Sequence, residues 1–184
     1  MAEFQEIYTA YVRRVYRFLL GLTGNSTEAE ELTQQTFYLA FRHIGKFEGR
    51  SSLYTWLCQI GKNAWLRECR RLSRLSGESI ETLAGLSETS DATQISGVNS
   101  NLMPEMSGSI EINLIKQEEH RRAVQKLTLL PQPYRDVVIL RIYGELPFSE
   151  IAALFGKSES WGKVTFFRGK EKLRKMMEDE DDTV

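Results

Sequence analysis

Apolar residues recur every three or four positions in two long blocks of this chain, and the stretch between the blocks has no such rhythm. The start of the first block shows the pattern most clearly, at Phe4, Ile7, Tyr8, Tyr11, Val12, Val15, Phe18, Leu19 and Leu22. This spacing places the side chains on one face of an α-helix. Residues 75–109 instead carry eight serines and few large apolar groups, as linkers do. The chain is therefore predicted to be all-α, with two small helical domains at 1–74 and 112–177, a flexible, acidic, serine-rich linker at 75–111, and an acidic tail at 178–184.

Polar residues and glycines predict where individual helices begin and end. Thr27 with Glu30 has the spacing of a capping box for the second helix. Ser51 or Ser52 is expected to cap the third helix. In the second block, we predict that a short helix and the final helix are bounded by Ser149, Gly156 and Ser158.

The formal net charge of −1 hides a strong segregation of charge along the chain. Residues 1–74 carry a net charge of +4 and residues 118–175 a net charge of +5. Residues 75–117 and 176–184 carry −5 each. Both helical blocks are therefore basic, which suits a polyanion such as nucleic acid, although an ordinary solvated helix face would carry the same excess.

Several classes of protein are disfavoured by what the sequence lacks. Cys58 and Cys69 form neither a disulfide framework nor a metal cluster, and we expect them to be free thiols of a cytosolic protein. No run of 18 apolar residues is present, so we expect no membrane insertion. His43 and His120 lie far apart, and the sequence has no nucleophile elbow and no phosphate-binding glycine loop. We therefore predict no enzymatic activity, no catalytic residues, no cofactor and no metal.

The segment from Phe148 to Leu173 predicts a helix-turn-helix. A short apolar helix leads to a turn at Gly156, and Ser158 begins a basic second helix. In such a unit the second helix enters the major groove of DNA and its N-terminal half meets the base edges. An ordinary pair of helices with a solvated basic face is the structural alternative. The predicted contacts to duplex DNA are Ser160, Lys163, Val164, Thr165, Phe167, Arg168 and Lys170.

A second candidate interface interleaves aromatic and basic residues between positions 46 and 71. Such a mixture suits single-stranded nucleic acid, because unpaired bases stack on aromatic rings and cations bind the backbone. Trp56 and Trp65 have helical spacing, so we assign them to the core. The candidate DNA-binding residues of this segment are Arg50, Tyr54, Lys62, Asn63, Arg67, Arg70 and Arg71.

Together these motifs resemble a bacterial extracytoplasmic-function (ECF) sigma factor. The family's region two is similar to EAEELTQQTF at 28–37, FEGRSSLYTW at 47–56 and IGKN at 60–63. Its region four is similar to LPQPYRDVV at 130–138, FSEIA at 148–152 and the segment from Ser158 to Leu173. The resemblance covers about residues 1–74 and 112–176, with the low-complexity gap in the matching place.

The resemblance implies a subunit that directs the initiation of transcription. In the family, region two binds a coiled coil on the β′ subunit of core RNA polymerase and melts the −10 element, and region four binds the β flap and reads the −35 element. The residues that match the −10-recognition segment are Lys62, Asn63 and Arg67. Those that match the −35-reading face are Lys163, Val164, Phe167 and Arg168. The polymerase-binding helix carries Glu31, Gln34, Gln35 and Phe37, with Glu30 beside them.

The resemblance also implies a location and a further partner. A sigma factor acts on promoter DNA, double-stranded and then single-stranded, in the cytoplasm at the nucleoid. Members of the family are commonly held by an anti-sigma factor. The sequence identifies neither that partner nor the promoter.

The sequence departs from the family pattern at several positions, among them Thr165, which replaces a basic residue. Glu31 stands where Asp is usual, and Gln35 stands where Glu is usual, which removes a negative charge from the predicted polymerase surface. Gly162 replaces a core valine, and Trp161 is expected to fill the gap and to be a core residue. The −35 sequence preference of other members therefore does not transfer to this chain.

Two other readings remain open at this stage. An ordinary helix-turn-helix regulator that does not replace sigma explains residues 130–176 and leaves the aromatic and basic segment unexplained. An interaction module that sequesters polymerase without reading DNA is disfavoured by the basic second helix.

For a sigma factor, about 25 base pairs separate the two elements, roughly 85 Å. A flexible linker of about 35 residues spans only about 30–35 Å on average, so we predict weak promoter binding by the free chain.

Overall fold

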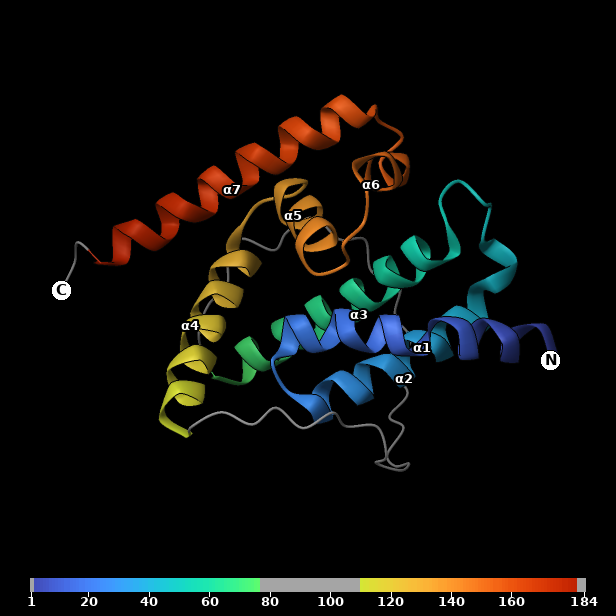
Figure 1. Ribbon diagram of the computed structural model, residues 1–184, viewed down its shortest axis with the longest axis horizontal. Helices are drawn as coiled ribbons and strands as arrows, with labels where there is room; N and C mark the ends of the chain where they lie inside the picture. The colour runs from blue at the N-terminus through green and yellow to red at the C-terminus, as the bar shows by residue number, and fades with distance from the viewer. Residues whose placement is uncertain (1, 77–109, 182–184) are drawn as a thin grey trace.

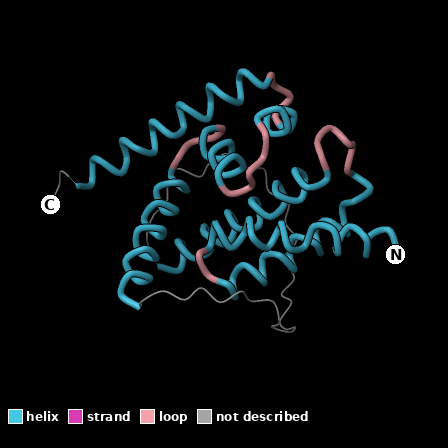
Figure 2. Tube along the Cα trace, viewed as in Figure 1, coloured by secondary structure: helices cyan, strands magenta, loops and turns pink. Residues whose placement is uncertain are grey.

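The structure, a computed structural model, describes residues 2–76 and 110–181 and is built from helices (Figures 1 and 2). The first half contains α1 (Ala2–Thr23), α2 (Ser26–His43), a short 3-10 helix η1 (Ile44–Lys46) and α3 (Leu53–Ser76). The second half contains α4 (Ile110–Leu129), α5 (Tyr134–Ile142), α6 (Phe148–Leu154) and α7 (Glu159–Asp181). No β-strand occurs in the described residues, which confirms the all-α prediction. Most of the predicted linker lies outside the described residues.

The first half is a three-helix bundle whose centre is apolar. Apolar side chains of all three helices meet there, among them the predicted stripe of the first helix, and burying each large side chain contributes about 1.5–3 kcal/mol. The buried residues include Val15, Phe18, Leu19, Leu22, Ala29, Leu32, Leu57 and Leu66. Trp65 is also buried, as predicted, whereas Trp56 is half-buried against Phe47.

The second half packs α5 and α6 against the long helix α7. Val137, Val138 and Ile139 of α5 are fully buried. Gly169 of α7 faces this helix so closely that a Cβ there would lie 2.7 Å from Cγ2 of Val138. The absence of a side chain at Gly169 therefore allows α5 and α7 to approach.

The helix ends partly match the predicted caps. Ser52 and Ser158 cap α3 and α7, accepting hydrogen bonds from the backbone N–H of Thr55 and Trp161. Gly156 has a φ of +61° after α6, as predicted. Two predictions were wrong. The cap of α2 is Asn25, whose side chain accepts from the N–H of Glu28, and α6 begins at Phe148 behind Pro147 without a side-chain cap.

The C-terminal helix is longer than the sequence suggested. We predicted an acidic, solvated tail from residue 178, but α7 continues to Asp181. Arg174 forms ion pairs at 2.8 Å with both Glu171 and Glu178, three residues before and four residues after it. Pairs at this spacing stabilise a helix surface, so they extend α7 into the acidic segment.

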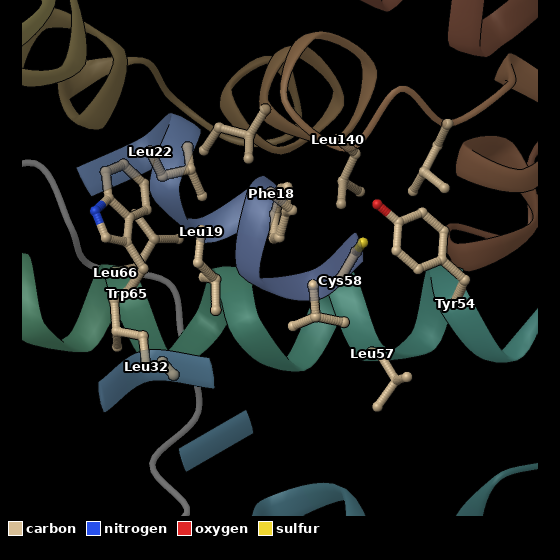
Figure 3. Close-up of a cluster of buried hydrophobic side chains, with 14 of the residues drawn as sticks. Phe18, Leu19, Leu22, Leu32, Tyr54, Leu57, Cys58, Trp65, Leu66 and Leu140 are labelled. Atoms are coloured by element: carbon tan, nitrogen blue, oxygen red, sulfur yellow. The ribbon is translucent and has the colours of Figure 1, made fainter. Parts of the chain in front are cut away.

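The two halves contact one another along a seam, defined here as the contacts that α1 and α3 make with α4, α5 and α6. Figure 3 shows Leu140 of α5 in the same apolar cluster as Phe18 and Tyr54 of the first half. The Tyr54 hydroxyl donates to the carbonyl oxygen of Gly144 at 3.4 Å. This seam places one face of α3 against the second half, and the second half therefore covers side chains on that face.

Candidate nucleic-acid interface

The N-terminal half of α7 exposes a mixed basic and apolar face. Lys163, Arg168 and Lys170 are exposed, and between them Val164 and Phe167 expose 48% and 64% of their surface. Lys163 pairs with Glu159 at 2.7 Å on the helix surface. Cations can bind phosphates and read base edges, and apolar groups can contact the methyl group of thymine. This face, with Ser160 at its start, is a surface that can enter a major groove.

One predicted DNA contact on α7 lies on the opposite side of the helix. Thr165 is only 5% exposed and faces the interior of the second half, so it does not belong to the exposed face. The sequence placed Thr165 with its neighbours because it replaces a basic residue of the family pattern. The burial removes it from our set of −35 candidates.

The structure also explains the unusual pair Trp161 and Gly162. A Cβ at Gly162 would lie 3.2 Å from the carbonyl oxygen of Phe148, so α6 and α7 approach closely at this point. Trp161 therefore does not fill a gap left by Gly162, contrary to our expectation. Its ring is half-buried and packs on Phe155, with ring centroids 5.2 Å apart. The contact between Trp161 and Phe155 thus joins the two ends of the turn between α6 and α7.

Lys62, the central −10 candidate on α3, is fully buried in the seam. Its Nζ lies 2.6 Å from Oδ2 of Asp136 on α5, and both side chains are almost completely covered. Burial lowers the pKa of Lys62, and the Asp136 carboxylate opposes that shift. Asp136 also accepts a hydrogen bond from Nε2 of Gln132 and lies 3.4 Å from Nε of Arg135. The pair thus sits in a small polar cluster that includes a second buried cation.

Other polar groups of α3 are buried without a hydrogen-bond partner. They are Oε1 of Gln59, Oδ1 of Asn63, and Nε and Nη2 of Arg70. Arg70 is half-buried, and its pKa is lowered by burial first and then by the neighbouring cations Arg135, Arg74 and Arg67. A buried polar group without a hydrogen-bond partner costs free energy. Another molecule that supplied such partners would therefore be bound favourably by this face of α3.

The remaining −10 candidates have different environments. Arg50, Arg67 and Arg71 are exposed, and Arg50 and Arg71 form surface ion pairs with Glu48 and Glu68. Tyr54 is buried, with its ring under the guanidinium of Arg14 at 3.8 Å, and burial raises the pKa of its hydroxyl. Tyr54 therefore offers no ring for stacking on a base while the seam is closed.

The outer face of α2 holds the predicted polymerase-binding residues. Glu31, Gln34 and Gln35 are exposed, and Glu30 is half-buried beside them. Phe37 is only 4% exposed and packs edge-on against Tyr8, with ring centroids 4.9 Å apart. Phe37 is therefore a core residue and not a contact for another protein.

Sequence reasoning missed three aromatic residues beside that face. Tyr38 and Phe41 lie on the exposed side of α2 and expose 40% and 49% of their surface, and Tyr8 of α1, whose ring packs on Phe37, exposes 40%. The sequence held a signal for Tyr38 and Phe41, because both fall outside the buried stripe of α2. It held none for Tyr8, whose spacing fits the apolar stripe of the first helix. We define Glu31, Gln34, Gln35, Tyr38 and Phe41 as the α2 outer face.

No alternative chemistry is evident in the described residues. They contain no cluster of three or more side chains suited to hold a metal ion. No described helix combines the length and apolar character needed to cross a membrane. Cys58 and Cys69 are free thiols, and burial raises the pKa of each to about 12.

Comparisons with known proteins agree with this architecture. Residues 7–75 match the family model of sigma-70 region 2, and residues 120–173 match that of sigma-70 region 4. The ECF sigma factor SigM of Bacillus subtilis is 26% identical, over 92% of this chain and 91% of SigM. The ECF sigma factor SigW of the same organism is 28% identical, over 96% of this chain and 89% of SigW.

Solved structures of sigma factors share the fold. RpoE, crystallised in complex with the anti-sigma factor NepR from Bartonella quintana, superposes with a TM-score of 0.54 at 20% identity, over 97% of this chain and 98% of RpoE. CnrH, in complex with the cytosolic domain of CnrY, superposes with a TM-score of 0.53 at 18% identity, over 96% of this chain and 88% of CnrH. With both regions matched in order and an all-helical fold, the chain belongs to the ECF family of RNA polymerase sigma factors.

Proposed function

We propose that this chain binds core RNA polymerase and directs initiation at promoters whose −35 element it reads with α7 and whose −10 element it opens with α3. Membership of the sigma factor family, a family of non-catalytic initiation factors, supports the first part. The exposed face of α7 is the observation that carries the second part. Lys163 and Arg168 flank the exposed apolar residues Val164 and Phe167. This arrangement suits a major groove, where phosphates flank the bases.

We assign the α2 outer face to polymerase binding. It combines polar residues, Glu31 among them, with two exposed aromatics, Tyr38 and Phe41. Aromatic residues are enriched at protein interfaces because they bury a large area at a low cost in conformational entropy. We assign the β′ coiled coil to this face and the β flap to the second half, an assignment that the resemblance to regions two and four supports.

We also propose that an anti-sigma factor restrains this chain. The chain itself is proposed to act at promoter DNA in the cytoplasm. Two of the similar solved structures are sigma factors in complex with such partners, NepR and CnrY. These complexes support a partner of the same kind for this chain.

Run-off transcription tests the proposed function. The full chain is mixed with core RNA polymerase and a library of templates randomised at the −35 and −10 positions, and the transcribed templates are sequenced. A sigma factor starts transcription with core enzyme alone and enriches both elements. A regulator acts only when another sigma factor is present, and a sequestering protein inhibits; either result contradicts the proposal.

A further inference from the structure

The face of α3 that we assign to −10 DNA lies inside the seam. Lys62 is fully buried against Asp136, and Asn63 and Arg70 have polar atoms that are covered but unpartnered. A DNA strand cannot reach these atoms in this arrangement. The second half therefore covers the groups that the first half needs for DNA.

Positive charge exceeds negative charge around Asp136, and DNA would supply negative charge. Lys62 and Arg135 both lie against this one carboxylate, at 2.6 Å and 3.4 Å. Burial, and after it the nearby Arg135 cation, lowers the pKa of Arg70 beside the same cluster. Buried cations that outnumber their counter-ion are costly, and a phosphate backbone would supply the missing negative charge.

The seam is held by further contacts outside this cluster. Nε2 of His120 donates to the carbonyl oxygen of Gly21 at 2.7 Å, and the N–H of Ser52 donates to Oε2 of Glu150 at 2.8 Å. The ring of Tyr143 lies directly over Gly21, where a Cβ would be 2.9 Å from Cδ1. Gly21 lies inside α1, and the absence of a side chain there allows the ring of Tyr143 to approach this closely.

We propose that Asp136 occupies the place of DNA against Lys62 and thereby holds the free chain in a closed state that cannot bind the −10 element. Opening the seam then exposes Lys62, Asn63 and Arg70 together. This inference rests on the assignment of α3 to −10 DNA in the proposed function. It adds a physical reason why the free chain binds promoters weakly, beyond the limited span of the linker.

Asp136→Asn tests the contact in the full chain. The substitution removes the counter-ion and leaves Lys62 and Arg135 facing each other, so the closed state loses its support. Glu119→Gln is the matched control, because it removes the same charge from an exposed position of α4 in the same half. Circular dichroism establishes that each variant keeps its helical content.

Two measurements follow for each variant. Small-angle X-ray scattering gives the radius of gyration, which is near 16 Å for a compact chain of this length and increases by about 4 Å or more when two bodies remain joined only by a tether. Fluorescence anisotropy gives the affinity for a single-stranded −10 oligonucleotide taken from the template selection. We expect Asp136→Asn to increase both, the affinity by tenfold or more, and Glu119→Gln to change neither.

Gly21→Leu provides an independent route to the same state. Leucine favours the helix more than glycine does, and the three atoms nearest to a Cβ at this position all belong to Tyr143. It should therefore open the seam without touching Asp136 or any DNA-contacting residue, and raise the affinity for the oligonucleotide as Asp136→Asn does.

The outcomes separate this inference from the proposed function. If both variants remain as compact as the wild type, the proposal that Asp136 holds the closed state is overturned. If the wild type is already extended, the closed state itself is overturned. If the variants open and the oligonucleotide affinity does not rise, occlusion of α3 is overturned. Either result can occur while run-off transcription succeeds, and failure of run-off transcription contradicts the proposed function instead.

Discussion

The two halves of this molecule present their DNA candidates in opposite ways. On α7 the basic residues Lys163 and Arg168 are exposed, with Phe167 between them. On α3 the central candidate Lys62 is fully buried against the other half. The comparison teaches that a basic composition alone does not make a nucleic-acid surface. The basic residues of α7 are exposed to solvent, whereas Lys62 of α3 is covered by the other half.

The largest expected effect concerns the packing that joins the halves. Leu140→Ala removes a fully buried side chain that belongs to α5 and packs in the cluster with Phe18 and Tyr54 (Figure 3). We expect the free energy of unfolding to fall by about 2–5 kcal/mol, measured by urea denaturation. Ile142→Ala, at a position of α5 that is 47% exposed, should change it by no more than about 0.5 kcal/mol. Equal effects of the two substitutions would contradict the packing described here.

The open face of α7 predicts the next largest effect. Arg168→Ala should weaken promoter recognition by about 1–3 kcal/mol, roughly fivefold to 150-fold, because arginine can read a base edge with two hydrogen bonds. Arg174→Ala is the control on the same helix, since that guanidinium already pairs with Glu171 and Glu178. Abortive-initiation assays with core polymerase measure both. A larger loss for Arg174→Ala would place the reading face elsewhere on α7.

Lys163 is expected to act on the DNA backbone and not on sequence. Lys163→Ala should weaken binding of duplex DNA to a similar extent on all sequences and reduce the slope of log affinity against log salt by about 1. Fluorescence titrations between low and moderate salt give that slope. An unchanged slope would show that Lys163 remains paired with Glu159 and does not reach a phosphate.

These predictions also show where the sequence was sufficient. The apolar spacing identified the helices and their inward faces because periodicity is a local property of the chain. It could not reveal the seam, because Lys62 and Asp136 lie 74 positions apart and neither has a local feature that marks the pairing. Thr165 and Phe37 were misplaced for a related reason: a family pattern assigns positions to a helix, but the packing of that helix decides which side is covered.

The two cysteines test the closure of the seam through their reactivity. Burial raises the pKa of both thiols to about 12, so the reactive thiolate is scarce at pH 8 and increases about tenfold for each pH unit up to that value. Cys58 is fully buried beside Tyr54 and Leu140, whereas Cys69 is partly exposed (Figure 3). A thiol reagent followed by mass spectrometry should label Cys69 faster in the wild type. Asp136→Asn should accelerate labelling of Cys58 more than that of Cys69, and an equal response would argue against opening at the seam.

The smallest effect is expected at the acidic C-terminus. Removing residues 178–184 deletes five acidic side chains next to the basic face of α7, among them the partner of Arg174. We expect non-specific affinity for duplex DNA to rise about twofold to fivefold at low salt and to converge with the wild type at high salt. No change at low salt would show that the acidic segment does not restrain the second half.

The central claim, that the free chain closes α3 and leaves α7 open, is tested most directly by lysine acetylation of the wild-type protein. Lys62 and Lys163 are compared by mass spectrometry, first in the free chain and then bound to core polymerase. Burial lowers the pKa of Lys62, which raises the fraction of its amine that is neutral and nucleophilic, so slow labelling of Lys62 would report lack of access and not protonation. We predict that Lys62 reacts at least about tenfold more slowly than Lys163 in the free chain and becomes reactive on binding polymerase. Equal rates for the two lysines in the free chain would contradict the account.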